Sequence, residues 1–283
     1  MKPTFSNTDS NIEFIPNSSG FSIPVRTYGL TGANIPLLML HGLQSHSGWF
    51  TQSGMFAASV GTPVYAMDRY GSGLSKAPRG GYRALEDSLA DILIAARYAM
   101  DRHGKKSIHI LGHCFGALTA AAFASVHSDI TKSLILPTPA LYTKTDVRPI
   151  DKARIFYSML SGQEVRVPVP LTPEMMSDMD EFVEFARKDP LSLRDAAGKS
   201  FLEIKKTRRF VKSRFKDIDA PFFMALAGKD PICRNDKNIR LFDSLNITDK
   251  KLKTYKQALH ILEFSPDRDE FFADLAGWLD AHK

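Results

Sequence analysis

The chain has 283 residues, of which 43% are hydrophobic and 24% charged, and its formal net charge is +6. This length and composition fit one large folding unit and exclude a disordered, collagen-like or low-complexity protein. The basic residues are spread along the chain, which argues against nucleic-acid binding. The first eleven residues hold no apolar segment of signal-peptide length, and no apolar run approaches the ~20 residues of a membrane span. We therefore expect a cytoplasmic protein without a transmembrane segment.

The sequence predicts a sheet that begins with a hairpin. Asn11 to Pro16 and Phe21 to Tyr28 are short extended segments, separated by Asn17-Ser18-Ser19-Gly20, which is typical of a turn. Short apolar runs follow, of the kind that is buried on both faces of a parallel sheet. They are Ile35 to Leu40, Pro63 to Met67, Ser107 to Leu111, Ser133 to Leu136 and Pro221 to Ala227.

Helix-length segments separate the first four of these runs. Leu85 to Met100 has apolar residues at helical spacing, and Phe115 to Ala124 is rich in small residues. Strands that alternate with helices predict an α/β fold with a doubly wound, mostly parallel sheet. From about Tyr142 to Lys216 this rhythm breaks, because prolines and methionines cluster there and no strand of the buried type occurs. We expect a helical cap at 142–216, inserted into a core formed by 1–141 and 217–283.

The run from Ile110 to Gly116 predicts a reactive cysteine. An apolar strand enters Gly-His-Cys-Phe-Gly, and a β-carbon at Gly112 or Gly116 would collide with backbone in the strained strand-to-helix turn that presents a nucleophile. Cys114 stands at the centre of this turn. The other cysteine, Cys233, reads as a bystander thiol, since two cysteines make no disulfide framework and lack metal-site spacing.

Two strand ends supply the partners that a nucleophile needs. Phe222 to Gly228 reads as a strand that delivers Asp230 at its carboxyl end, and His260 follows the last candidate strand. Rival acids are Asp217, Asp219 and Asp236, of which Asp236 is better placed to cap the following helix.

Backbone NH groups near the cysteine predict an oxyanion hole. A strand ends in His-Gly before Leu43, whose NH is then free to bind a developing oxyanion, and the NH of Phe115 follows Cys114. His41 and His113 flank these positions, and we interpret both as braces of the loop and the turn.

The chain resembles a known family. The order Cys114, Asp230, His260 is the nucleophile, acid, histidine order of α/β-hydrolases. The sequence is similar to their serine aminopeptidase S33, or monoacylglycerol lipase-like, branch from about Phe14 to Leu279, and least so within 142–216. The matching stretches are LHGLQSHSGWF, YAMDRYGSGLS, the turn at 112–116, KDPLSL, ALAGKDPIC and LHILEFSPDRDEFFADLAGWLD. The resemblance implies an α/β-hydrolase fold, and it departs from the family at Cys114, where serine is usual.

The residue types suggest acyl chemistry. Cys114 would attack as a thiolate, His260 would move the proton, and Asp230 would orient the imidazole. Because the resulting acyl-cysteine reacts with amines and alcohols as well as water, an acyltransferase stays open beside a hydrolase. A ligand-binding protein on a hydrolase scaffold, and a serine exchanged experimentally for cysteine, are further alternatives.

The expected substrate is a small ester or thioester with a moderately hydrophobic acyl group, free or bound to a carrier. We expect no cofactor and no metal, and the oligomeric state stays open. Met159, Met176 and Met179 are candidates for an acyl pocket, although packing of a cap explains most such residues. Lys205 to Lys216 holds seven basic residues in twelve. A solvated helix face is the first interpretation of it, and an anionic lipid surface or an acidic or phosphorylated carrier are the alternatives.

Overall fold

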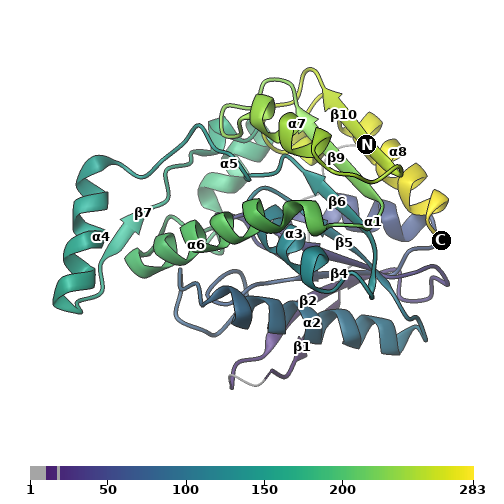
Figure 1. Cartoon of the computed structure of the whole chain (residues 1–283), viewed down its shortest axis with the longest axis horizontal. Coiled ribbons are helices and arrows are strands. Elements are labelled where there is room, and N and C mark those ends of the chain that lie inside the picture. The colour runs from purple at the N-terminus through teal and green to yellow at the C-terminus, as the bar shows by residue number, and fades with distance from the viewer. Residues whose placement is uncertain (1–10, 18–19) are drawn as a thin grey trace.

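An eight-stranded sheet forms the centre of the molecule (Figure 1). The computed structural model describes residues 11–17 and 20–283. The strand order is β1-β2-β4-β3-β5-β6-β9-β10, parallel from β4 to β10 and antiparallel at β1 and β2. The strands are β1 Asn11–Ile15, β2 Ile23–Tyr28, β3 Leu37–Leu40, β4 Val64–Met67, β5 Ile108–Gly112, β6 Thr131–Pro137, β9 Phe222–Ala227 and β10 Lys250–Tyr255.

The predicted hairpin and the five predicted buried runs are confirmed. β1 pairs with β2 in antiparallel register, with Ile15 opposite Ile23, while residues 18 and 19 of the predicted turn lie outside the described residues. The apolar runs form β3, β4, β5, β6 and β9, and all but one residue of these strands is buried. Their carboxyl ends meet at one edge of the sheet, which is where α/β sheets place their sites.

Helices cover both faces of the sheet. α2 (Leu85–Arg102) and α3 (Gly116–Val126) pack together on one face, and α1 (Thr51–Ser59) and α8 (Arg268–Ala281) pack together on the other (Figure 1). The predicted helices at Leu85 to Met100 and Phe115 to Ala124 correspond to α2 and α3. α7 (Asn235–Asp243) lies between β9 and β10 in the chain.

The segment between β6 and β9 contains helices and one feature that the sequence analysis missed. Its helices are α4 (Pro149–Ser161), α5 (Asp180–Lys188) and α6 (Gly198–Arg214). It also contains a two-stranded antiparallel sheet, β7 (Arg166–Pro168) with β8 (Asp195–Ala197), which the sequence did not predict. Three-residue strands are too short to show an alternating pattern. We call 142–216 the inserted segment.

In the part of the chain that the structure describes, no helix is both long and apolar enough to cross a membrane.

Candidate active site

Cys114 occupies a strained turn between β5 and α3. Its backbone φ is 53°, a left-handed conformation that is rare for a residue with a side chain. A β-carbon on Gly112 would come within 2.5 Å of the Gly116 carbonyl oxygen and the Ala120 side chain, and one on Gly116 would collide with the carbonyl oxygen of Leu40. Only glycine fits at either position, as the sequence analysis expected.

Asp230 and His260 form a buried pair at the same edge of the sheet. Asp230 follows β9, His260 follows β10, and Nδ1 of His260 lies 3.0 and 3.1 Å from the two carboxylate oxygens. Both side chains are at most 1% exposed. Oδ1 of Asp230 also accepts hydrogen bonds from the backbone NH groups of Ile232 and Cys233, at 2.8 and 3.0 Å. These contacts hold the carboxylate in one orientation.

The electrostatics of this pair favour an ionised carboxylate. Burial by itself raises the pKa of the Asp230 carboxyl, but the charge of His260 and the hydrogen bonds lower it below its usual value. Burial lowers the pKa of His260, but the charges of Asp230, Cys114 and Cys233 outweigh burial and raise it well above its usual value. Cys114 is thus within electrostatic reach of the imidazole. The second ring nitrogen, Nε2, is buried and has no hydrogen-bond partner among the described residues.

Cys233 lies in direct contact with Asp230 and His260, although the sequence suggested that it takes no part in the site. Its Sγ is 3.9 Å from Nδ1 of His260, and its backbone NH donates to Asp230. Burial raises the pKa of the Cys233 thiol to about 12, so it stays protonated at neutral pH. Cys233 therefore contributes a backbone NH to the acid while its thiol remains inert.

Asp230, Cys233 and His260 are also spaced like metal ligands. Their ligand atoms lie within 4.8 Å of one another, and they are the one such group in the described part of the chain. The Asp230 carboxylate is already hydrogen-bonded to Nδ1 of His260 and to the backbone NH groups of Ile232 and Cys233. The contacts fit an acid and imidazole pair better than a metal site.

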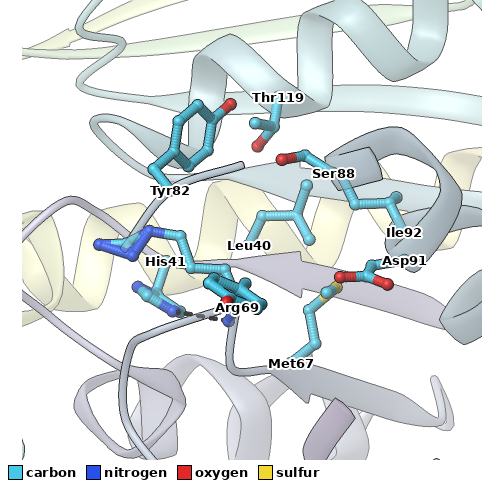
Figure 2. A pocket seen from close by; sticks show the side chains of 10 residues that line it. Leu40, His41, Met67, Arg69, Tyr82, Ser88, Asp91, Ile92 and Thr119 are labelled. Atoms are coloured by element: carbon cyan, nitrogen blue, oxygen red, sulfur yellow. Dashed lines mark hydrogen bonds between the residues drawn. The ribbon is translucent and has the colours of Figure 1, made fainter. Parts of the chain in front are cut away.

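Leu43 and Phe115, the two residues expected to offer oxyanion NH groups, both contact Arg69. Nη2 of Arg69 donates to the Leu43 carbonyl, and the guanidinium carbon lies 5.3 Å from the centre of the Phe115 ring. Figure 2 shows Arg69 beside His41 and Tyr82 in a small pocket that all three residues line. Arg69 was not predicted as a site residue, because the glycine-rich turn that carries it gives no sign of where its long side chain points.

His41 and His113 brace the loops around Cys114, as expected. Nε2 of His41 accepts the Arg69 backbone NH at 3.2 Å, which is the dashed line in Figure 2. Nε2 of His113 lies 2.9 Å from the Thr138 hydroxyl. Burial lowers the pKa of His41 well below its usual value and that of His113 to about 3, so both are neutral near pH 7.

A cavity of about 730 Å³ opens beside Cys114. Leu43, Cys114 and Phe115 line its inner end, and the inserted segment supplies most of the remaining wall, including Ile155, Phe156, Met159, Pro170, Leu171, Phe201, Leu202 and Ile204. Cys114 itself is only 4% exposed. A substrate therefore has to reach it through this cavity.

The three candidate methionines are not together in this cavity. Met159 lines it, but Met176 and Met179 are not among its lining residues. Met176 is buried instead, and its carbonyl accepts hydrogen bonds from the backbone NH groups of His260 and Ile261, at 3.0 and 2.9 Å. Met179 packs against the core. The expectation that Met176 and Met179 line an acyl pocket is wrong for this cavity, because Met176 lies against the loop of His260 and Met179 packs on the core.

A sequence profile of the family described as serine aminopeptidase, S33, matches residues 34–267. The chain belongs to this family. Human monoglyceride lipase is 20% identical over 276 residues, a match that covers 95% of this chain and 90% of that protein. An uncharacterized abhydrolase domain-containing protein of Dictyostelium discoideum is 25% identical over 250 residues, which are 85% of this chain and 26% of that longer protein.

Solved structures agree on the fold of this S33-family chain. A soluble variant of the Saccharomyces cerevisiae monoglyceride lipase, crystallised with a substrate analog, superposes with a TM-score of 0.84 at 16% identity and covers 100% of this chain and 98% of its own. The fold is that of an α/β-hydrolase, and the chain is a hydrolase of the monoglyceride lipase and esterase type.

Glu263 links the loop of His260 to α1. Its Oε1 accepts hydrogen bonds from the backbone NH groups of Gln52 and Ser53, at 2.7 and 3.1 Å, and Oε2 accepts the Ser53 hydroxyl at 2.6 Å. The side chain is buried, which raises the pKa of its carboxyl from 4.5 to about 7. Glu263 therefore titrates in the neutral range.

The Glu263→Gln variant should gain stability relative to the parent as pH rises. A carboxyl with a raised pKa binds its proton more tightly in the folded chain than in the unfolded chain, so the folded state loses stability as pH rises from 4.5 to about 7. Between pH 5 and pH 8 the difference in the free energy of unfolding should shift by about 2 kcal/mol in favour of the variant. Urea unfolding at both pH values measures it, with Glu86→Gln on the exposed face of α2 as control. A difference independent of pH would contradict the assignment.

Proposed function

We propose that the protein cleaves esters or thioesters through an acyl-enzyme intermediate on Cys114, with His260 as the base and Asp230 as its orienting acid. The observation that carries this proposal is the backbone of Cys114. A left-handed, strained residue flanked by glycines that cannot be replaced presents its thiol at the inner end of a large cavity. Strain of this kind persists where function requires it.

In the proposed reaction, the Cys114 thiol gives its proton to His260, and the resulting thiolate attacks the carbonyl carbon, so that the carbonyl oxygen becomes an oxyanion. The NH groups of Leu43 and Phe115 bind this oxyanion. The carbon to oxygen or carbon to sulfur bond then breaks, and the leaving group takes a proton from the His260 imidazolium. A water molecule next attacks the thioester, gives its proton to His260 and releases the acid and the thiolate. Asp230 stabilises the imidazolium throughout.

We further propose that the inserted segment acts as a cap over this site and sets the substrate class. Its wall of the cavity is mostly apolar, which suits a moderately hydrophobic small molecule. The two cysteines, Cys114 and Cys233, are free and buried. Nucleophilic catalysis by a free thiol suits a reducing compartment such as the cytoplasm.

Intact-mass spectrometry tests the proposal directly. After mixing with p-nitrophenyl butyrate, the protein should gain one butyryl group, and peptide mapping should locate it on Cys114. The Cys114→Ala variant should gain none. An adduct on another residue, or turnover with no adduct and no loss in Cys114→Ala, would refute the proposed nucleophile. Adding an amine or alcohol acceptor to the same reaction shows whether the acyl group passes to it faster than to water.

A further inference from the structure

Charged side chains line part of the cavity beside Cys114. Four are cationic and one is a carboxylate: Lys144, Lys152, Lys205, Arg208 and Asp146. Lys152 pairs with Asp146 at an exposed position, and Lys144 donates to the backbone carbonyl of Asp230. Lys205 is exposed to solvent. Arg208 differs from the others, because its Nε is buried and has no hydrogen-bond partner among the described residues.

Arg208 is held next to the cysteine turn. Its Nη2 donates to the carbonyl of Ala140 at 3.4 Å, and the backbone NH of Ala140 donates to the carbonyl of Cys114 at 3.0 Å. One residue therefore connects the guanidinium to the backbone of Cys114. Burial lowers the pKa of Arg208, and a charge on Cys114 acts in the opposite direction, so the two groups interact electrostatically.

Apolar side chains line the cavity from the part of α6 that precedes Arg208. Phe201, Ile204 and Arg208 are spaced by three and four residues, which places them on one face of α6. Phe201 and Ile204 share the cavity with Ile155 and Phe156 of α4, the helix that lies farthest from the sheet in Figure 1. Arg208, the cation held next to the Cys114 turn, is thus followed along the same face of α6 by the apolar side chains of Ile204 and Phe201.

We propose that the substrate carries an anionic oxygen group, a carboxylate or a phosphate, close to its scissile carbonyl, and that Arg208 binds this group. This inference rests on the proposed function of Cys114. The planar guanidinium matches both anions with paired hydrogen bonds, whereas a neutral substrate would leave a buried donor unpaired. The apolar part of the substrate then lies between α4 and α6.

Two pairs of esters test the inference and identify which half of the substrate carries the charge. p-Nitrophenyl butyrate and mono-p-nitrophenyl glutarate differ by a carboxylate on the acyl half, while 1-butyrylglycerol and its 3-phosphate differ by a phosphate on the leaving group. In one pair the anionic ester should have the higher kcat/KM. In Arg208→Gln the ratio of kcat/KM for the anionic ester to kcat/KM for the neutral ester should fall about 10- to 100-fold, mainly because KM for the anionic ester rises. Arg208→Lys should restore part of it.

Arg209→Gln is the matched control, because Arg209 is the next residue of α6, is exposed and does not line the cavity. It should keep the preference of the parent. Equal kcat/KM values within both pairs in the parent, or the same loss in Arg209→Gln, would overturn the inference.

Alkylation gives a readout that does not depend on ester turnover. Iodoacetate and iodoacetamide have nearly the same shape, but only iodoacetate carries a charge next to its reacting carbon. The ratio of their alkylation rates at Cys114 should fall about tenfold or more in Arg208→Gln and remain in Arg209→Gln. An unchanged ratio would refute the anion site even if Cys114 is acylated by esters. A lower ratio without any acyl adduct would refute the proposed function and leave the anion site standing.

Discussion

Replacing Cys114 by alanine should lower kcat/KM for p-nitrophenyl butyrate by a factor on the order of 10⁵. The change removes the only protein atom that forms a bond to the acyl carbon in the proposed mechanism, and it leaves the backbone NH groups of Leu43 and Phe115 in place. Residual activity would then come from binding and oxyanion stabilisation alone. Release of p-nitrophenolate, followed over hours at high enzyme concentration, measures so large a loss.

The matched control is Cys233→Ala. This variant removes the other buried thiol but keeps the backbone NH of residue 233, which donates a hydrogen bond to Asp230. Its activity should stay within about tenfold of the parent, because a thiol that burial keeps protonated is a poor nucleophile. If Cys233→Ala lost as much activity as Cys114→Ala, the role assigned to Cys114 would be wrong.

Asp230→Asn should lower kcat by a factor of about 10³ to 10⁴ while the fold is kept. The amide nearly matches the carboxylate in size, but it does not stabilise an imidazolium and its NH₂ group favours the wrong tautomer of His260. The substitution alters the contacts of 3.0 and 3.1 Å between Nδ1 of His260 and the two carboxylate oxygens of Asp230. Single-turnover hydrolysis, with circular dichroism to verify folding, measures the effect.

Asp236→Asn is the control for this second prediction. Asp236 was a rival acid in the sequence, but it lies exposed in the first turn of α7 and pairs with Arg234. The structure corrects its expected role as a cap, because α7 begins at Asn235 and no side chain caps it. Asp236→Asn should retain the activity of the parent. A larger loss here than in Asp230→Asn would reverse the assignment of the acid.

The interior strands and the β1–β2 hairpin were predictable from the sequence, whereas β10 and the three-residue strands β7 and β8 were not. β3 to β6 and β9 are buried on both faces, so their sequences are continuous apolar runs. β10 is the last strand of the sheet and carries lysines at 250, 251 and 253, as an edge strand commonly does. Its sequence therefore lacks the continuous apolar run that reveals a buried strand. β7 and β8, at three residues each, are shorter than any period that could reveal them.

The positions of the site residues were more predictable than their surroundings. Cys114, Asp230 and His260 each follow a strand, and parallel strands bring such positions together at one edge. Arg208 stands in a run of seven basic residues, of which most are solvated as expected. A signal did exist for it, since Ile204 and Val211 place Arg208 on the buried face of α6 and Arg209 on the exposed one. Which group such an arginine faces depends on tertiary packing.

The hydrogen bonds that the Met176 carbonyl accepts from the backbone NH groups of His260 and Ile261 limit how this enzyme can be redesigned. Ser177 adds a further bond from its hydroxyl to the carbonyl of Phe264, at 2.5 Å. The inserted segment thus holds the loop that carries His260, the proposed base, through hydrogen bonds at both ends of residues 260–264. A chimera that replaces 142–216 with the corresponding segment of a relative therefore has to retain the stretch around Met176.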